Sequence, residues 1–285
     1  MRRALPIRQG IENMDILRTV TPNQLSIQAI WGKVLRHFPH VNADYAHRKR
    51  DYAIAAITFF CVGVSAIFEL RASVEMQQVL GTIAWLCLAG LLLGENRETQ
   101  MQVAIAVVFA TAGEHFASLY MGGYTYRFEN VPAYVPPGHG MVYLTAVALA
   151  RSGFFLRYAR GIAVFVIVVW GAWSLWGVSG YAEKGDSVGA LLFCIFLGWL
   201  IAGRSPMVYL AAFFVTTWLE LMGTAVGAWK WAPIDPLLGW PQGNPPSGAS
   251  AWYCLVDAVA IGGAAPVLHG VRRAVHRLRL GRLSG

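Results

Sequence analysis

Eight apolar runs separated by short polar segments constrain the fold of this chain more than any other feature. Each is long enough, or nearly so, to cross a hydrocarbon layer of roughly 30 Å. They occupy residues 52–68, 77–93, 101–120, 140–155, 161–178, 187–202, 206–223 and 249–269. Because only 13% of the 285 residues are charged and 56% are hydrophobic, a water-soluble globule would lack polar surface. The sequence therefore predicts an all-α, polytopic helical membrane bundle of about eight transmembrane helices.

The Lys and Arg residues are distributed unequally between the predicted loops. If the N-terminus is cytoplasmic, 19 of the 23 lie on the cytoplasmic side, and only Arg71, Arg127, Lys184 and Lys230 lie on the other. Positive loops resist translocation, so the pattern predicts a multi-pass protein of the cell inner membrane with both termini cytoplasmic. The net charge of +8 then reflects topology and contact with anionic lipid. We expect no nucleic-acid partner.

One pattern occurs twice along the chain. An apolar helix with a late glutamate is followed by a glycine, two aromatic residues one position apart, a double proline and a tyrosine that opens the next apolar run. The copies are Glu114, Gly122, Tyr124, Tyr126, Pro136, Pro137 and Tyr143, and Glu220, Gly227, Trp229, Trp231, Pro245, Pro246 and Tyr253. Such self-similarity indicates an internal duplication, with chance recurrence as the alternative. An even number of helices per unit keeps both units in one orientation, which predicts two parallel four-helix repeats.

The predicted segments follow from the spans and the repeat. Residues 1–50 form a cytoplasmic segment, 51–155 the first four-helix repeat with an outer loop at 121–139, 156–270 the second with an outer loop at 224–248, and 271–285 a basic cytoplasmic tail. Within the first segment, a capping sequence at 21–24 and apolar residues at helical spacing predict an amphipathic helix over 22–38. We expect this helix to lie on the membrane surface or to pack against the bundle.

Four ionisable residues are the candidates for catalysis: Glu114, Glu220, His139 and Asp257. An ionisable side chain within a membrane span is expensive and is by default a functional hypothesis. We expect the four to face one outward-opening site, where two carboxyl groups in unlike environments serve as acid and base and His139 carries a proton. The alternative is that each glutamate pairs with Arg127, Lys230 or a backbone donor and only holds a loop in place.

Neither a metal nor a cofactor is expected. Glu114 and His115 are adjacent on a helix and point about 100° apart, so they would not easily grip one ion. The four cysteines, at 61, 87, 194 and 254, lie in apolar runs without the spacing of a metal site or a disulfide framework. We interpret them as small buried hydrophobes.

The two outer loops supply the candidates for substrate binding. Both double prolines precede a helix whose free amides favour an anion, and the neighbouring glycines allow a ligand to approach the backbone. The aromatic residues are typical of a membrane-interface belt, but they could also line an apolar groove for an acyl or isoprenoid chain. The predicted substrate-binding residues are Tyr124, Tyr126, Trp229, Trp231, Asn244, Ser247, Tyr143 and Tyr253.

One string in the second copy contains Glu220, Gly223, Gly227, Trp229 and Trp231. It resembles the glutamate, glycine and spaced-aromatic signature of polytopic carotenoid-biosynthesis proteins of the hydratase type. The similarity covers about a dozen residues per copy. This sequence departs from the family signature in the spacing of its glycines, in having tryptophans in place of tyrosines, and in both proline loops. The resemblance implies water addition to an isoprenoid double bond with Glu220 or Glu114 as proton donor. Otherwise the repeat resembles stretches of uncharacterised bacterial integral-membrane proteins.

The sequence therefore leads to one main functional hypothesis and two alternatives. The main hypothesis is an integral-membrane enzyme that acts on a lipid-like or isoprenoid substrate at the outer, periplasmic face by acid–base chemistry. The alternatives are an assembly subunit of a membrane complex and a small-solute transporter. The expected partners are membrane lipid and a lipid-like substrate, and a homo-oligomer is left open.

Overall fold

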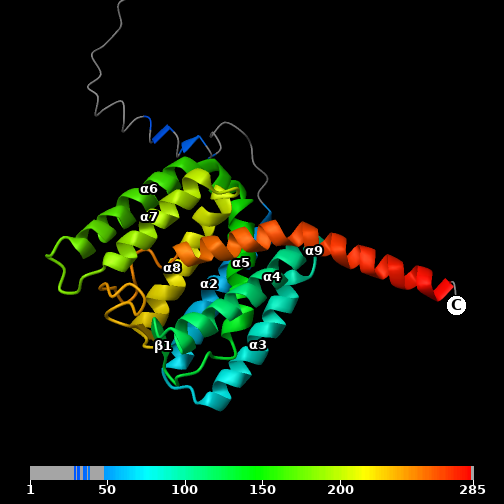
Figure 1. Ribbon diagram of the computed structural model, residues 1–285, viewed down its shortest axis with the longest axis horizontal. Helices are drawn as coiled ribbons and strands as arrows, with labels where there is room; N and C mark the ends of the chain where they lie inside the picture. Colours follow the sequence, from blue (N-terminus) through cyan, green and yellow to red (C-terminus); the bar gives the residue numbers. More distant parts are fainter. Residues whose placement is uncertain (1–28, 30, 33–34, 37, 39–47, 284–285) are drawn as a thin grey trace, which may run out of the picture.

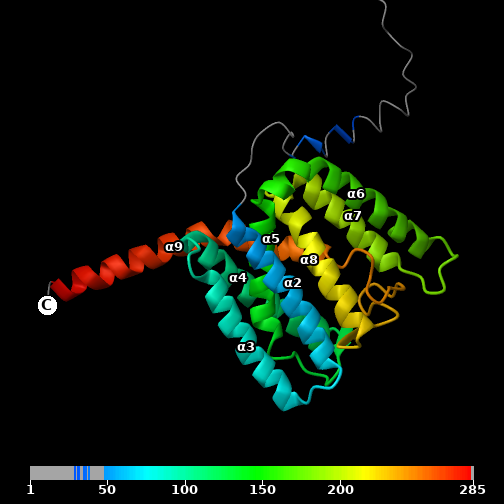
Figure 2. The same ribbon diagram turned by 180° about the vertical axis from the view of Figure 1, so that it is seen from behind.

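The computed structural model describes residues 29, 31, 32, 35, 36, 38 and 48–283, with the side chains of 275–283 left undescribed (Figures 1 and 2). Within this part the chain is mostly helical. The α-helices are α2 (Lys49–Glu69), α3 (Val74–Leu92), α4 (Arg97–Glu114), α5 (Val135–Ala150), α6 (Gly153–Val178), α7 (Ser187–Ala202), α8 (Pro206–Ala225) and α9 (Ala251–Leu283). A π-helical turn, η1 (His115–Tyr120), extends α4, and two short strands, β1 (Tyr124–Tyr126) and β2 (Trp229–Trp231), complete the fold.

The predicted polytopic helical bundle is confirmed in its main feature. Six helices of the described chain are long and apolar enough to cross a membrane, namely α2, α3, α4 with η1, α6, α8 and the first 24 residues of α9. α5 and α7 are also apolar but have only 16 residues each. α5 runs through the centre of the bundle, where it contacts α2, α3, α4 and α8, and most of its residues are buried.

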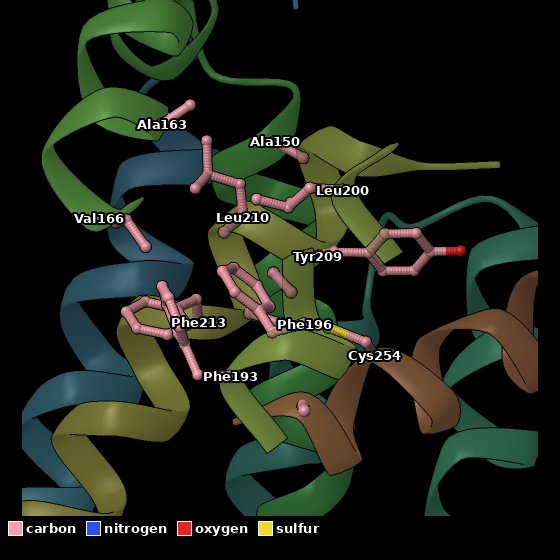
Figure 3. Packing of buried hydrophobic residues seen from close by; sticks show 14 of the residues in the cluster. Ala150, Ala163, Val166, Phe193, Phe196, Leu200, Tyr209, Leu210, Phe213 and Cys254 are labelled. Atoms are coloured by element: carbon pink, nitrogen blue, oxygen red, sulfur yellow. The ribbon is translucent and has the colours of Figure 1, made fainter. Parts of the chain in front are cut away.

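Packing divides the helices into a central group and an outer pair. α4 and α8 each pack against both α5 and α9, while α6 and α7 lie side by side at the edge. The larger core cluster joins the outer pair to α8 (Figure 3). Its centre is aromatic, with the rings of Phe196 and Phe213 4.7 Å apart and those of Trp170 and Phe213 4.8 Å apart. Such ring pairs supply packing specificity in addition to the buried area.

Several element boundaries differ from the predicted segments. α6 begins at Gly153 because the Ser152 hydroxyl accepts the Phe155 amide and caps the helix, so the division expected between residues 155 and 156 lies inside this helix. The last five residues of the predicted loop 121–139 belong to α5, because the double proline suits the first helical turn. The predicted tail 271–285 continues α9 as far as Leu283.

The predicted amphipathic helix 22–38 lies largely outside the described residues. Of its described members, Ala29, Trp31, Gly32 and Leu35 are helical. Phe38 is buried and Leu35 packs beside it against the core cluster of α6, α7 and α8. Arg160 Nε of α6 donates to the Phe38 carbonyl at 3.3 Å. At these positions the segment packs on the bundle, which was one of the two expected arrangements.

One end of the bundle is held by a cluster of ion pairs. Arg151, between α5 and α6, contacts the buried Asp51 carboxylate at 2.7 Å and Glu95 at 2.8 Å. Arg50 adds a contact of 3.3 Å to Glu95. The hydrogen bond from Arg151 holds the pKa of Glu95 below its ordinary value, against the effect of burial. The cluster therefore ties the start of α2 to the α3–α4 and α5–α6 turns.

Candidate functional site

At the opposite end of the bundle, the two spaced-aromatic motifs pair with each other. β1 and β2 are antiparallel, with Tyr124 opposite Trp231 and Tyr126 opposite Trp229. Both strands follow a glycine with φ of +72°, Gly122 before β1 and Gly227 before β2. A left-handed residue at this point turns the chain sharply out of the preceding helix, and glycine adopts it without steric cost.

The backbone bonds that flank the strand pair are reciprocal. The amide of Arg127 donates to the Ala228 carbonyl at 3.0 Å, and the amide of Ala232 donates to the Gly123 carbonyl at 3.0 Å. The two donors, Arg127 and Ala232, each directly follow a strand, and the two acceptors, Ala228 and Gly123, each directly precede one. Exchanging the two strands therefore reproduces the same bonding pattern.

The Glu114 carboxylate is fixed on one side by the tyrosines of its own motif. Its Oε2 accepts the hydroxyl of Tyr124 at 2.5 Å and that of Tyr126 at 2.8 Å. Burial, followed by the negative charge of Glu114, raises the pKa of both phenols. Both hydroxyls therefore stay protonated and remain hydrogen-bond donors to Glu114.

The second copy repeats this arrangement with different donors. Glu220 Oε2 accepts the indole Nε1 of Trp229 and of Trp231, each at 3.0 Å. An indole N–H donates but cannot accept or readily release a proton. Gly223 makes room for this contact, because a Cβ at that position would lie 1.8 Å from the Trp229 ring. The two glutamates thus share a geometry but differ in the chemistry around them.

The π-helical turn compensates for a difference in length between the copies. Gly122 comes eight positions after Glu114, whereas Gly227 comes seven positions after Glu220. The first copy widens into η1 while α8 stays α-helical to Ala225. A π-turn accommodates one additional residue within a helix. β1 can therefore meet β2 in register although its approach is one residue longer.

His139, on the first turns of α5, connects Glu114 to α9. Its Nε2 lies 3.5 Å from Glu114 Oε1 and its Nδ1 lies 3.1 Å from the Tyr253 hydroxyl. The imidazole is 5% exposed, and within the described chain Nε2 has no hydrogen-bond partner. When Tyr253 donates to Nδ1, the proton of the neutral ring is on Nε2 and points toward the free oxygen of Glu114.

These groups form one end of a cavity of ≈ 470 Å³. The cavity has the size of a small-molecule pocket. Its walls are mostly apolar and come from α2, α3 and α5, with a small contribution from α8 and the start of β2. The cavity is also lined by Ser65 of α2 and by a group of polar and aromatic residues near the strand pair, namely Glu114, Tyr126, Tyr134, His139, Trp229 and Tyr253.

The apolar part of the cavity lies between α2 and α3. Its wall residues include Phe60, Val79 and Ile83, which are 69%, 57% and 56% exposed on the outer surface of the bundle. Cys61 of α2 and Cys87 of α3 also line it. In a membrane, this surface would face lipid, so a hydrophobic ligand could enter from the side.

The structure brings only some of the predicted site residues to this cavity. Glu114, His139, Tyr126, Trp229 and Tyr253 line it. The remaining predicted residues are Tyr124, Tyr143, Glu220, Trp231, Asn244, Ser247 and Asp257, and none of them is among the lining residues. Tyr124, Trp231 and Glu220 belong to the strand-pair arrangement directly behind it. Asp257 and Tyr143 lie deeper, where the Tyr143 hydroxyl donates to Gln102 Oε1 at 3.0 Å.

The second proline loop has internal partners in place of the expected anion. Asp186, the N-cap of α7, accepts the amides of Gly243 and Ser247, each at 2.7 Å. The Asn244 side chain accepts the Trp231 amide at 2.9 Å, and the Ser247 hydroxyl lies 3.0 Å from that of Ser174. The free amides that we expected to bind a ligand are therefore occupied by a carboxylate of the chain itself.

Two important residues were not anticipated from the sequence. Asp186 precedes Ser187 as a helix cap, and this is the only local signal that it offers. Tyr134 lies two residues before the Pro-Pro motif and lines the cavity, where its hydroxyl interacts electrostatically with Glu69. Burial and then the Glu69 carboxyl raise the pKa of Tyr134, which keeps its hydroxyl protonated.

The described residues contain no group of three or more His, Cys, Asp or Glu side chains suited to a metal ion. None of the protein-family models, curated proteins or solved structures with which the chain was compared matches it. The functional interpretation therefore depends on the geometry of the cavity and its polar end.

Proposed function

We propose that this protein is an integral-membrane enzyme that protonates an uncharged, lipid-like substrate, with Glu114 as the acid. The supporting observation is the unequal environment of its two carboxyl oxygens. Oε2 is occupied by two tyrosine hydroxyls, whereas Oε1 lies 3.5 Å from His139 Nε2, and the residue lines the cavity. A proton on Oε1 is thus directed toward a bound ligand while the tyrosines hold the group in orientation.

The same contacts support the step that follows proton transfer. When Oε1 gives its proton to the substrate, Glu114 becomes an anion that already accepts two hydroxyl hydrogen bonds on Oε2. These bonds strengthen as the charge develops, so they stabilise the ionised state more than the neutral one. His139 Nε2, 3.5 Å from Oε1, places a further N–H on the side of the ionised group.

The lining of the cavity favours a substrate without a charge. Among its described lining residues there is no Lys or Arg to neutralise a phosphate or carboxylate. An apolar chain between α2 and α3 would place an alkene, hydroxyl or carbonyl end near Glu114. The predicted resemblance to carotenoid-biosynthesis hydratases is compatible with an isoprenoid chain whose double bond takes the proton and then water.

Glu220 has a different place in this proposal. Its carboxylate accepts both indole N–H groups of β2, and it does not line the cavity. The strand pair links it to Glu114, so it serves to hold β2 and, through β2, the tyrosines of β1. We therefore assign the acid to the first copy and a positioning role to the second.

The proposal also includes an internal duplication of four helices and a membrane topology. The reciprocal strand bonds, the paired positive-φ glycines and the packing of α4 on α9 and of α8 on α5 support two related four-helix units, with α5 and α7 as short spans. The Lys/Arg distribution supports an inner-membrane location with both termini cytoplasmic. The Glu114 site would then open at the outer side.

The proposal can be tested by isotope labelling in isolated membranes, where lipid synthesis has stopped. Membranes that contain the protein are incubated in heavy water, and their extracted lipids are examined by mass spectrometry for deuterium bound to carbon. Protonation of a carbon atom by Glu114 introduces a C–D bond that does not exchange with water. We expect a labelled neutral lipid that disappears with Glu114→Gln, since the amide keeps the size of the group but cannot donate the acid proton.

Glu220→Gln is the matched control. The amide oxygen still accepts an indole N–H, so the variant should fold and keep most of the labelled product. The proposal is wrong if Glu114→Gln yields the same labelled lipid as the parent chain, or if labelling depends on Glu220 alone. Both variants are compared at equal amounts of folded protein in the membrane.

A further inference from the structure

The tip of the second outer loop, residues 232–241, presents apolar side chains to its surroundings. Ile234, Leu237, Leu238 and Trp240 are 46–70% exposed, and none of them is among the described residues that line the cavity. The tip contains one charged residue, Asp235, and its side chain is buried. An exposed cluster of apolar side chains of this kind marks a contact with another molecule or with a membrane.

The backbone amides of the tip are satisfied within the protein. Asp235 Oδ1 accepts the amides of Leu237 and Leu238 at 3.0 and 2.8 Å. Three further amides donate to carbonyls of the same loop, those of Asp235, Gly239 and Gln242. Three more residues have no N–H to satisfy, namely Pro233, Pro236 and Pro241. Backbone that leaves water for lipid must have its polar groups satisfied internally, and this loop largely meets that condition.

The tip is attached to the start of α7. The Pro241 carbonyl accepts the Val188 amide at 3.2 Å, and a Cβ at Gly185 would lie 3.2 Å from the Pro241 ring. Ile234 pairs with Pro241 in a β-bridge. Figures 1 and 2 both show the loop that follows β2 beside the turn between α6 and α7. The depth of the tip in a membrane is therefore set by the end of α7.

α7 is short for a helix that crosses a membrane. Its 16 residues cover about 24 Å, against a hydrocarbon layer of roughly 30 Å. At the same end, the last turn of α6 and the residues after it carry Trp176 and Tyr181, which are exposed and stacked on each other. Such aromatic residues are typical of the membrane–water boundary. The start of α7 then lies at lipid depth, and the attached tip lies at the boundary.

We propose that residues 232–241 form an interfacial loop that docks into the lipid leaflet at this end of the bundle and completes the short span of α7. The inference rests on the proposed membrane topology and is independent of the acid role of Glu114. Lipid fits the tip because its exposed side chains are uncharged and most of its amides need no water. The tip presents four apolar side chains, whereas a stable protein interface uses roughly 20 residues or more on each side.

The docking is tested by fluorescence of the full-length protein in vesicles of phosphatidylcholine and phosphatidylglycerol. In a background without native cysteines, Leu237→Cys is labelled with an environment-sensitive dye. We expect emission shifted to shorter wavelength, strong quenching by a lipid with a nitroxide near the top of its acyl chain, and little quenching by iodide on both sides of the vesicle. Glu183→Cys is the matched control, because it is an exposed polar position in the adjacent turn and should show the opposite pattern.

A second labelled site separates the behaviour of the loop from that of the dye. Leu238→Cys should give the same pattern as Leu237→Cys. Adding Leu237→Asp to this protein should reduce the quenching by the nitroxide lipid, since an ionised carboxylate is costly in lipid. Unchanged quenching would show that the dye itself seeks the lipid, and it would contradict the proposal.

Two other results would overturn the docking. Efficient quenching by iodide at position 237 would place the tip in water. Protection from both iodide and the nitroxide lipid would show that protein covers the tip, either a second copy or another subunit. These measurements need no substrate and do not depend on which face of the membrane is outside. The loop can therefore fail while the labelling by Glu114 stands, and a failure of that labelling leaves the loop intact.

Discussion

Tyr124 and Trp231 face each other across the β1–β2 pair with ring centroids 4.7 Å apart, yet their polar atoms bond to different glutamates. The Tyr124 hydroxyl donates to Glu114, and the Trp231 indole donates to Glu220. The four aromatic side chains of β1 and β2 lie on one face of the strand pair, and they hold both carboxyl groups there. A change at one glutamate should therefore be felt at the other through the backbone bonds of the strands.

Removing a tyrosine hydroxyl from β1 should weaken both stability and activity. Tyr126→Phe leaves the ring in place but removes one of the two donors to Glu114 Oε2. We expect a loss of about 1.5–3 kcal/mol, as for other hydrogen bonds to charged groups. Thermal unfolding in detergent measures the loss, and a double-mutant cycle with Glu114→Gln isolates the pair. Additive effects of the two substitutions would show that the bond is not formed.

A methyl group at Gly223 should displace Trp229. Its Cβ would overlap the indole ring, so Gly223→Ala should break the bond from Trp229 to Glu220 and lower the melting temperature. Gly262→Ala, in α9, is the control because no atom lies within 4 Å of the added Cβ, and helix propensity favours alanine there. Equal stability of the two variants would contradict the close approach of Trp229.

The ion cluster at the other end predicts acid-sensitive stability. Arg151 holds the pKa of Glu95 below its ordinary value of about 4.3. The folded pKa is the lower one, so this stabilisation is complete above the ordinary value and is lost as the pH falls through the folded pKa. Unfolding midpoints measured from pH 7 to pH 3 should fall for the parent chain. Glu95→Gln should be less stable at pH 7 and flatter over this range.

The strand pair and its outer location can be tested with cysteines. Thr125 and Lys230 are opposite each other, and both are exposed. Opposite residues of antiparallel strands lie roughly 4.5–5.5 Å apart, within the range of a disulfide. In a background without native cysteines, the double variant Thr125→Cys with Lys230→Cys should cross-link on oxidation. Each single variant should react with an impermeant thiol reagent in intact cells, and labelling only after permeabilisation would contradict the topology.

The native cysteines report on the occupancy of the cavity. Cys61 and Cys87 line it, whereas Cys194 is exposed elsewhere and Cys254 is buried. A membrane-permeant thiol reagent should modify Cys61 and Cys87 in the empty protein, and a bound neutral isoprenoid alcohol should slow that reaction. The phosphate ester of the same chain should protect less, because the described lining has no basic residue. Cys194→Ser removes the background signal, and equal protection by both lipids would contradict the uncharged substrate.

Much of the fold could be predicted because apolar runs determine where helices form. The late glutamates, the turn glycines and the spaced aromatics were also evident from the sequence. Their mutual contacts were not, since the pairing of β1 with β2 joins residues more than 100 positions apart. Asp186 illustrates the same limit. It caps a helix locally, but its bonds to Gly243 and Ser247 depend on how two distant loops meet.

The cavity itself could not be inferred from residue types. Cys61 and Cys87 were interpreted as small buried hydrophobes. Residue type alone does not distinguish the wall of a cavity from a packed core. The difference arises from the separation of α2 and α3, which is a matter of helix packing. Asn244 and Ser247 fit the pattern of a ligand loop equally well, but their polar atoms are used by Trp231 and Asp186.

The π-helical turn η1 has a consequence for how such a chain can be altered. A residue added to an α-helix rotates everything beyond it by about 100°, which would turn β1 away from β2. η1 absorbs the added residue locally, so the strand keeps its register. The segments 114–126 and 220–231 thus act as interchangeable modules of unequal length, and a chain engineered to carry the tyrosine module on α8 would acquire a second acid on the same face of the strand pair.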